Sequence, residues 1–181
     1  MKQSDWNALL LLPVAAITAP AYAIDYFTAE QAQKQIFPDA QVFKPMLVKL
    51  SSAQRDQIKL MAGVRQRWEE QKVWRVEKDG KLAGWFVVDN VVGKHEFITY
   101  GVGITPDGHV VGVEVMSYRE TKGDQVRDAV WRKHFVGKTL ADPFKLDEDV
   151  PNISGATLSS RNMLDGVKRL LALQKVALTG E

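Results

Sequence analysis

The stretch that decides the fold is KVWRVEKDGKLAGWFVVDNVV, which occupies residues 72–92. Residues 73–77 alternate between apolar and polar side chains, a period of two that is typical of a strand with one buried face. Asp79-Gly80 is a residue pair that tight hairpin turns prefer, and residues 82–92 continue as a second strand. The stretch therefore predicts an antiparallel β-hairpin.

The segment that follows extends the sheet by a second hairpin. Residues 96–104 predict a third strand, and Pro106-Asp107-Gly108 predicts a tight turn. Residues 109–118 then return antiparallel as a fourth strand.

Two capping boxes lie before the strands, at residues 28–31 and 51–54. The first predicts a short helix that ends near Phe37. The second predicts a charged helix that runs to about Arg67 and has an apolar stripe of Ile58, Met61 and Ala62. Residues 44–50 contain a proline and fit either a weak strand or a loop.

Helical patterns return after the strands. Residues 124–134 suit a helix that ends at Gly137 and has Val126, Ala129 and Val130 on one side. A polar, acidic connector follows at residues 141–149. The last helix has the clearest pattern, with a broad apolar face formed by Met163, Leu164, Val167, Leu170 and Leu171. Strands flanked by helices predict an α+β fold, an antiparallel sheet of hairpins with helices packed around it.

The amino-acid composition excludes several kinds of functional site. The 181 residues are 45% hydrophobic and 25% charged, which is typical of a soluble globular protein. The net charge of +2 and the lack of a basic block do not indicate a nucleic-acid partner. The chain has no cysteine, which excludes disulfides, thiol nucleophiles, Cys-ligated zinc, iron–sulfur clusters and c-type haem attachment. Three scattered histidines offer little for a metal site, so redox chemistry requires an organic cofactor or oxygen ligands.

The N-terminus is typical of a targeting segment. Residues 8–19 are apolar, Lys2 precedes them, and Ala21-Tyr22-Ala23 has the small-x-small pattern of a signal-peptidase site. The apolar run is shorter than the roughly 20 residues of a spanning helix, and two prolines interrupt it. We expect residues 1–23 to be a signal peptide and the protein to be periplasmic. The alternatives are an uncleaved membrane anchor or a buried N-terminal helix.

A hydroxyl-rich motif, Ser154-Gly155-Ala156-Thr157-Leu158-Ser159-Ser160, stands immediately before the predicted last helix. Free N–H groups and the positive end of the helix dipole make such a position an anion site. Gly155 allows the backbone to approach closely, and the hydroxyls add donors. The alternative is that Thr157, Ser159 or Ser160 only caps the helix, although one hydroxyl is enough for a cap.

This motif, Ser-Gly-Ala-Thr-x-Ser, resembles the flavinylation motif of the FMN-binding domain family. That family includes the covalent FMN subunits of sodium-pumping quinone reductases and of Rnf-type electron-transfer complexes. In it, a flavin transferase moves the FMN moiety of FAD onto a threonine hydroxyl, and the matching residue here is Thr157. The resemblance implies an FMN phosphoester on Thr157, in a phosphate pocket shaped by Ser154, Gly155, Ala156, Ser159 and Ser160.

The resemblance extends over about residues 73–173. Residues 118–123 are similar to the family's Glu-Thr-x-Gly segment, and residues 131–138 are similar to the Trp/Phe/Gly-Lys stretch that follows it. The resemblance implies binding roles for Glu120, Thr121, Gly123, Trp131 and Lys138. Glu120, Thr121 and Lys138 would meet the polar edge of the flavin or its phosphate, and Gly123 would form a turn beneath the cofactor.

Each of these roles has a simpler alternative in the residue types alone. Trp131, and likewise Trp85, would pack against the isoalloxazine or simply fill the core. A solvated loop accounts equally well for Glu120 and Thr121, a surface charge for Lys138, and a helix start for Gly123.

Two departures from the family pattern stand out. The family usually places an aspartate six positions before the acceptor threonine, where this chain has Pro151. Asp149 and Asn152 are the neighbouring candidates for that role in recognition by the transferase. The chain also resembles a free-standing exported domain rather than a subunit that keeps a membrane helix. The implied organisation is a signal peptide at 1–23, an N-terminal helical segment at 24–70 and an FMN-binding domain at 71–178, the last two forming one compact unit.

Two functions remain open at this point. The resemblance implies an exported electron carrier, rather than a stand-alone enzyme, that passes electrons between membrane and periplasmic redox proteins after a flavin transferase has loaded it. The alternative is an exported non-redox module that binds a phosphate-bearing ligand or a partner protein.

Overall fold

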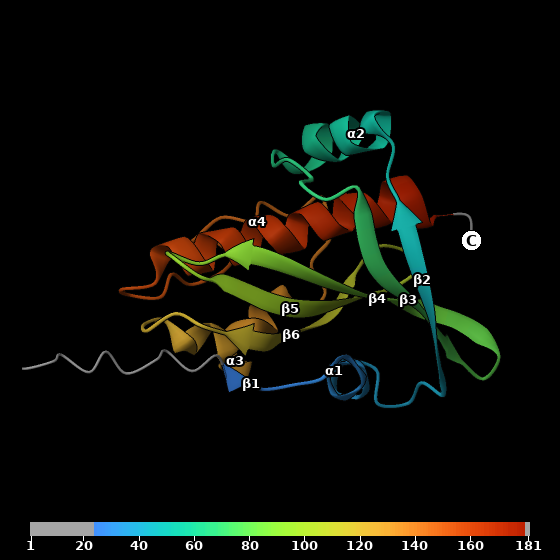
Figure 1. Cartoon of the computed structure of the whole chain (residues 1–181), viewed down its shortest axis with the longest axis horizontal. Helices are drawn as coiled ribbons and strands as arrows, with labels where there is room; N and C mark the ends of the chain where they lie inside the picture. Colours follow the sequence, from blue (N-terminus) through green and yellow to red (C-terminus); the bar gives the residue numbers. More distant parts are fainter. Residues whose placement is uncertain (1–23, 180–181) are drawn as a thin grey trace, which may run out of the picture.

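The computed structural model describes residues 24–179, so the predicted signal peptide lies outside the described residues (Figure 1). Its centre is an antiparallel sheet with the strand order β1-β6-β5-β4-β3-β2. The strands are β1 (Ile24–Asp25), β2 (Val42–Lys49), β3 (Glu70–Lys78), β4 (Lys81–Val92), β5 (Phe97–Ile104) and β6 (Val110–Tyr118). The predicted α+β fold of antiparallel hairpins is confirmed.

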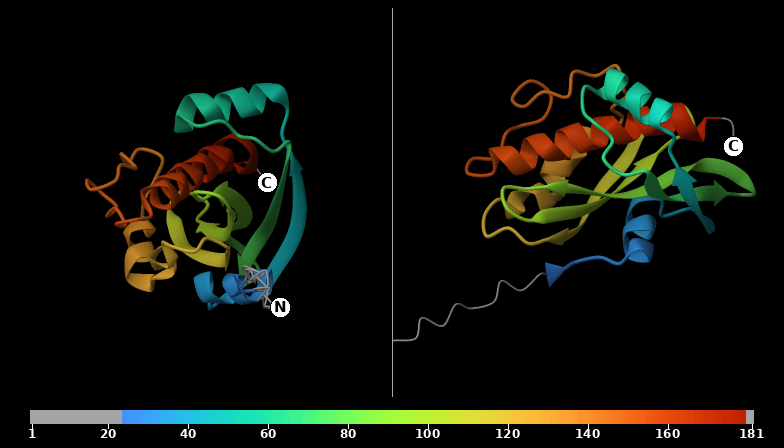
Figure 2. Two further views of the ribbon diagram at one scale, coloured as in Figure 1. Left: turned by 60° about the vertical axis from the view of Figure 1, so that its left-hand side comes forward. Right: turned by 45° about the horizontal axis from the view of Figure 1, so that its top comes forward.

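Helices cover both faces of the sheet (Figure 2). The α-helices are α1 (Ala29–Ile36), α2 (Ser52–Ala62), α3 (Ala129–Arg132) and α4 (Thr157–Leu173). The long helix α4 lies on one face with α2 packed on it, and α1 packs against the opposite face at β5 and β6. Within residues 24–179, no helix combines the length and the hydropathy needed to cross a bilayer.

Local signals set several boundaries as predicted. Thr28 and Ser51 are the N-caps of α1 and α2, and each forms a complete capping box with the glutamine three residues later. Asp79-Gly80 joins β3 to β4, with a positive φ at both residues. These contacts are local in the chain, which is why sequence patterns are sufficient to predict them.

Two predicted helices differ from the structure. The helix that begins after Ser51 ends at Ala62 rather than near Arg67, because Gly63 adopts a left-handed conformation (φ 76°) and caps it. The helix expected over residues 124–134 is instead a 3₁₀ turn (Asp124–Arg127), the four-residue α3 and a second 3₁₀ turn (Lys133–Phe135). The extended backbone of Asp128 (ψ 127°) interrupts it.

The prediction of which side chains in residues 124–134 form the apolar side is also wrong in part. Val126 is buried, but Val130 is 75% exposed and Ala129 is exposed. The other buried side chains of this segment are Trp131 and Phe135, which pack edge to face. The uninterrupted helical periodicity assumed for the prediction does not hold across the break at Asp128.

The outer strands are the parts least visible in the sequence. For residues 44–50 the sequence predicts only a weak strand or a loop. All but the last of them lie in β2, which pairs with β3 from Val42↔Glu77 to Lys49↔Glu70. Because β2 is an edge strand, the sheet tolerates Pro45, which has no backbone N–H. The two-residue β1, which was not predicted, pairs with the end of β6.

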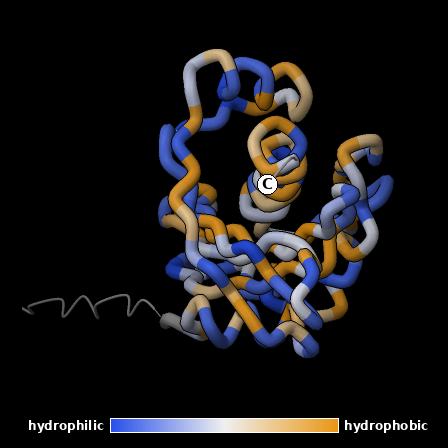
Figure 3. Tube along the Cα trace, turned by 90° about the vertical axis from the view of Figure 1, so that its right-hand side faces the viewer, coloured by the Kyte–Doolittle hydropathy of each residue, from blue (hydrophilic) through white to orange (hydrophobic). Residues whose placement is uncertain are grey.

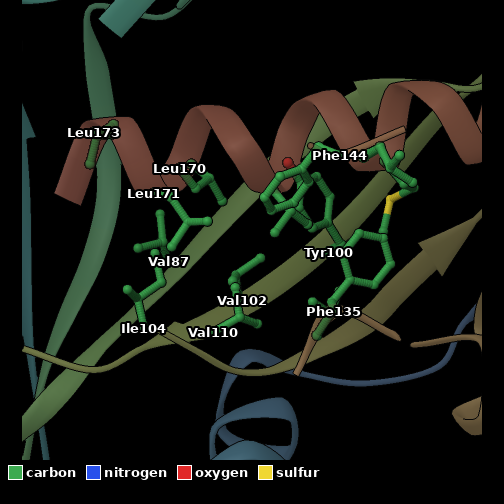
Figure 4. Close-up of a cluster of buried hydrophobic side chains, with 14 of the residues drawn as sticks. Val87, Tyr100, Val102, Ile104, Val110, Phe135, Phe144, Leu170, Leu171 and Leu173 are labelled. Carbon is green, nitrogen blue, oxygen red and sulfur yellow. The ribbon is translucent and has the colours of Figure 1, made fainter. Parts of the chain in front are cut away.

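The main core lies between α4 and the sheet. Figure 3 looks along the molecule from the C-terminal end of α4, with the sheet beneath the helix. All five residues of the predicted apolar face of α4 are at most 1% exposed. Leu170 and Leu171 point toward Val87 of β4 and Val102 of β5 (Figure 4). A second, smaller cluster joins α1 to the other face through Ile36, Phe37 and Phe86.

One buried ion pair joins α4 to the sheet within this core. The Arg169 guanidinium of α4 donates to Asp89 Oδ2 of β4, and the two side chains are only 6% and 1% exposed. The Tyr100 hydroxyl of β5 donates to the same oxygen over 2.7 Å. Burial and the Asp89 carboxylate raise the pKa of Tyr100 well above its ordinary value. Burial lowers the pKa of Arg169, but Asp89 and Tyr100 outweigh it, so the guanidinium stays charged.

Removing the cation from this pair is expected to destabilise the fold. Arg169→Met leaves the Asp89 carboxylate buried without its counter-ion, and the free energy of unfolding should fall by about 3–5 kcal/mol. Lys168→Met is the matched control, because it removes the neighbouring cation, whose amine is exposed. Urea denaturation followed by circular dichroism measures both. Equal losses in the two variants would contradict a structural role for the pair.

Candidate functional site

A pocket of about 400 Å³ opens at the N-terminal end of α4. Three segments line it: the turn between β4 and β5, the segment after β6, and the start of α4. Its lining residues are Lys94, His95, Glu120, Thr121, Lys122, Gly155, Ala156, Thr157, Leu158 and Ser159. The antiparallel register brings these segments to one end of the sheet, because Val92 pairs with Phe97 and Ile98 pairs with Tyr118 (Figure 1).

The start of α4 has no side-chain cap. The N-cap residue is Ala156, which has no hydroxyl, and no side chain bonds the first turn as a cap. The Ser160 hydroxyl, 0% exposed, instead donates back to the Ala156 carbonyl over 3.2 Å. The N–H groups of Thr157, Leu158 and Ser159 therefore have no acceptor among the described residues. Donors of this kind, together with the positive end of a 17-residue helix, favour an anion.

Gly123 and Tyr118 support the start of α4 from below. Gly123 has a φ of 86°, and a Cβ built on it would lie 2.3 Å from the Ala156 Cβ and 2.8 Å from the Tyr118 hydroxyl. That hydroxyl donates to the Lys122 carbonyl and so fixes the loop in which Gly123 lies. Burial raises the pKa of Tyr118, and the Ser159 hydroxyl acts against it. Only a glycine allows the loop to approach the helix this closely.

Glu120 holds the opposite wall of the pocket. Its Oε1 accepts N–H hydrogen bonds from His95 and, over 2.9 Å, from Glu96. Partial burial raises the pKa of Glu120, but these N–H groups, that of Lys94 and the charge of His95 outweigh it, so the pKa lies below its ordinary value. Glu120 thus fixes the β4–β5 turn, which brings Lys94 and His95 to the pocket.

The charges around the pocket suit an anionic ligand. Lys94 and Lys122 line it, and neither has an ion pair among the described residues. The one carboxylate in the lining, that of Glu120, is engaged by backbone N–H groups. The donor set is therefore two amines, the free N–H groups of α4 and the hydroxyls of Thr121, Thr157 and Ser159.

The structure brings most of the predicted site residues together. Gly155, Ala156, Thr157, Ser159, Glu120 and Thr121 line the pocket, and Gly123 lies directly against Ala156. Thr157 is exposed at the first position of α4. Ser154 is exposed just before the pocket, and Ser160 is buried behind it.

Two further predicted residues, Trp131 and Lys138, are not among those that line the pocket. Trp131 is 6% exposed, and its Nε1 donates to the Pro151 carbonyl over 2.8 Å. Lys138 forms an ion pair with Asp149 at 2.8 Å, with both side chains largely buried. Both contacts stabilise the connector that leads to α4. Trp85, at 1% exposed, lies in the main core.

Asp149 and Asn152, the residues near Pro151 that could replace the family's usual aspartate, form their hydrogen bonds within and next to the connector. Asp149 accepts hydrogen bonds from Lys138 and from the backbone N–H groups of Phe144 and Lys145. Burial raises its pKa, but these partners outweigh it, so the pKa is below its ordinary value. The Asn152 N–H donates to Asp147. Asp149 therefore has a structural role in the conformation of this connector.

Sequence reasoning missed four lining residues: Lys94, His95, Lys122 and Leu158. The residue types of Lys94 and His95 and their place between two predicted strands indicate only solvated charges in a hairpin turn. The signal that identifies them is topological, since a turn that follows Val92 must lie at the same sheet end as the segment after Tyr118. Leu158 is 49% exposed at the pocket.

Comparison with known proteins shows which protein family the region around the pocket resembles. Residues 93–172 match the family model described as the FMN-binding domain, a range that includes every predicted site residue. This part of the chain, which includes the pocket at the start of α4, is therefore similar to an FMN-binding domain.

Two solved structures are similar to the chain. NqrC of Shewanella oneidensis is 25% identical with a TM-score of 0.53, over 76% of this chain and 81% of that one. The equivalent component of the Na⁺-translocating NADH-quinone reductase of Parabacteroides distasonis is 15% identical with a TM-score of 0.56, over 85% and 86%, and shows the shared fold. No curated protein matches the chain. The FMN-binding domain is thus related to NqrC, which supports a flavin electron carrier.

The role of Glu120 in the β4–β5 turn leads to a pH-dependent prediction. Because its pKa is lowered in the folded protein, its stabilisation is complete above the ordinary value of 4.5 and is lost as the pH falls through the lowered pKa. Glu120→Gln should lower the free energy of unfolding by about 1–2 kcal/mol at neutral pH, and the difference should become smaller as the pH falls through the lowered pKa. Urea denaturation between neutral pH and about pH 3, well below the ordinary glutamate pKa, tests this. Glu96→Gln, on the same turn and exposed, is the control; a difference that persists unchanged in acid would refute the role.

Proposed function

We propose that this chain is an electron carrier that holds FMN through a phosphoester on Thr157. The observation that carries the proposal is the start of α4, where an exposed threonine hydroxyl stands beside helix N–H groups that have no cap. A phosphate esterified at this hydroxyl would lie at the positive end of the helix dipole, an interaction of about 0.3–1 kcal/mol, or more if partly buried. The match to the FMN-binding domain supports the identity of the ligand.

The attachment is a group transfer from FAD. The Thr157 oxygen forms a bond to the FMN phosphorus, the bond between the two phosphates of FAD breaks, AMP leaves, and the hydroxyl proton is released. A flavin transferase would catalyse this step. The exposure of Thr157 supports its access to such an enzyme.

The residues present fit FMN. Lys94 and Lys122 supply the positive charge for the phosphate, and the N–H groups of α4 supply hydrogen bonds. Leu158 offers an exposed apolar side chain at the pocket for one face of the flavin ring. Gly123 and Tyr118 keep the helix start in place, and Glu120 keeps the β4–β5 turn against it. When bound, FMN supplies one- and two-electron chemistry.

We further propose that the protein is exported and exchanges electrons with membrane or periplasmic redox proteins. The apolar residues 8–19 and the Ala-Tyr-Ala pattern at residues 21–23 support a cleaved signal peptide. A covalent bond suits an exported carrier, because FMN lost outside the cytoplasm is not readily replaced.

Intact mass of the chain co-expressed with a flavin transferase tests the attachment. The wild type should gain the mass of FMN less one water and stay yellow after acid precipitation. Thr157→Ala should remain folded and lose the covalent flavin completely. Thr121→Ala, which removes another exposed hydroxyl of the same pocket, should keep it.

The other outcomes each exclude part of the proposal. Flavin that is released by acid would overturn the ester but keep FMN as the ligand. A colourless wild type would favour the non-redox module that binds a phosphate-bearing ligand.

A further inference from the structure

Two exposed aromatic side chains lie at the end of the sheet where the pocket at the start of α4 opens, which we call the flavin pocket. Trp68, just before β3, is 44% exposed, and Phe97, at the start of β5, is 48% exposed. With Arg119 they line a hollow of about 270 Å³, together with Asn90 and Thr99. The Thr99 hydroxyl donates to Asn90 over 2.7 Å, so these two polar side chains satisfy each other. Within residues 24–179 the two aromatic rings contact no other aromatic ring, and about half of the surface of each residue is exposed to solvent.

Basic side chains surround this hollow. Arg65 and Arg67 lie beside it in a neighbouring depression that also includes Asn90, so the two depressions adjoin. Arg119 of the hollow is followed in the sequence by Glu120, Thr121 and Lys122, which line the flavin pocket. Lys94 lines the same pocket. We call Arg65, Arg67, Lys94, Arg119 and Lys122, with Trp68 and Phe97, the basic face.

The charges of the basic face are not neutralised within the described residues. None of its five cations forms an ion pair there. Asp165 and Glu120 are the carboxylates that line the three depressions, and Glu120 is engaged by backbone N–H groups. Arg169, which also lines one depression, is paired with Asp89. The exposed Glu96 on the β4–β5 turn is a third carboxylate beside these residues, so five cations stand against three carboxylates and the basic face has a local excess of positive charge.

We propose that the basic face is the docking surface for an acidic electron-transfer protein, which inserts an apolar side chain into the hollow between Trp68 and Phe97. The proposal rests on the proposed function, because it names the partner of the same site. Unpaired cations attract and orient an acidic partner, and exposed Trp and Arg residues are the types that contribute most at interfaces. The concave, aromatic hollow suits a single protruding side chain of a protein. Its position next to the pocket brings that protein close to the flavin.

Paramagnetic broadening of amide signals by hexacyanochromate(III), a trianion, tests the basic face without flavin. In the full-length chain lacking FMN, broadening should be strongest at residues 65–68, 94–97 and 119–122. The double variant Arg67→Glu/Arg119→Glu should reduce it about five-fold or more, because a reversed field repels the probe. Lys81→Glu reverses a single charge at the β3–β4 turn, at the other end of the sheet, and should leave the broadening of these residues unchanged.

An acidic decapeptide with one central tryptophan tests the hollow. It should displace hexacyanochromate at a lower concentration than the same peptide with a central alanine, and Trp68→Ala should abolish that difference. If the two peptides are equivalent on the wild type, the insertion of an apolar side chain is wrong.

Other outcomes overturn the docking surface itself. Broadening confined to residues 155–159 would mean that only the phosphate pocket attracts anions. Broadening of equal strength around Lys81 would mean that the face has no preference. Binding to phosphatidylglycerol vesicles that the double variant loses would assign the face to a lipid surface instead. Because none of these measurements needs flavin, they are independent of whether Thr157 carries FMN.

Discussion

The position of α4 on the sheet depends on the buried contact between Arg169 and Asp89. Apolar packing alone allows a helix to slide or rotate by a residue, whereas an ion pair in the core has one geometry that avoids a large desolvation cost. Tyr100 shares the same carboxylate oxygen and ties a second strand to it. Twelve residues before Arg169, the same helix begins at Thr157. The contact that fixes the helix therefore also fixes where its first N–H groups lie relative to the β4–β5 turn.

The sequence could predict the fold where the decisive interactions are local. Alternation in residues 73–77, the Asp79-Gly80 turn and the two capping boxes depend on neighbours within four residues. Predictions of helix ends fail where the backbone conformation of one residue interrupts the helix, as at Gly63 and Asp128. The prediction for β2 is weak because this segment becomes a strand through pairing with β3, which is distant in the sequence. The same distinction between local and distant interactions applies to the residues of the site. Its motif at residues 154–160 and its Gly123 loop could be predicted, but Lys94 and Lys122 enter it through the register of β4, β5 and β6.

The hydroxyl-rich motif differs in structure from an ordinary helix start. A serine or threonine at the N-cap would satisfy one of the N–H groups, but Ala156 occupies that position and Ser160 bonds backwards to it. The energy that a cap would contribute, about 1 kcal/mol, is thus absent from the folded chain. Such a loss is common where binding matters more than local stability. The connector before it compensates, since Lys138, Asp149 and Trp131 hold its conformation through partners of their own.

Pro45 limits how other chains can approach the sheet. An exposed edge strand is normally a template to which a foreign strand can add by backbone hydrogen bonds. In β2, Pro45 removes one backbone donor from the middle of that edge, and β1 pairs with β6 at Ser117 and Tyr118 on the opposite edge. Strand addition is thereby disfavoured at β2 and obstructed at the end of β6. Both features act against edge-to-edge aggregation of the sheet.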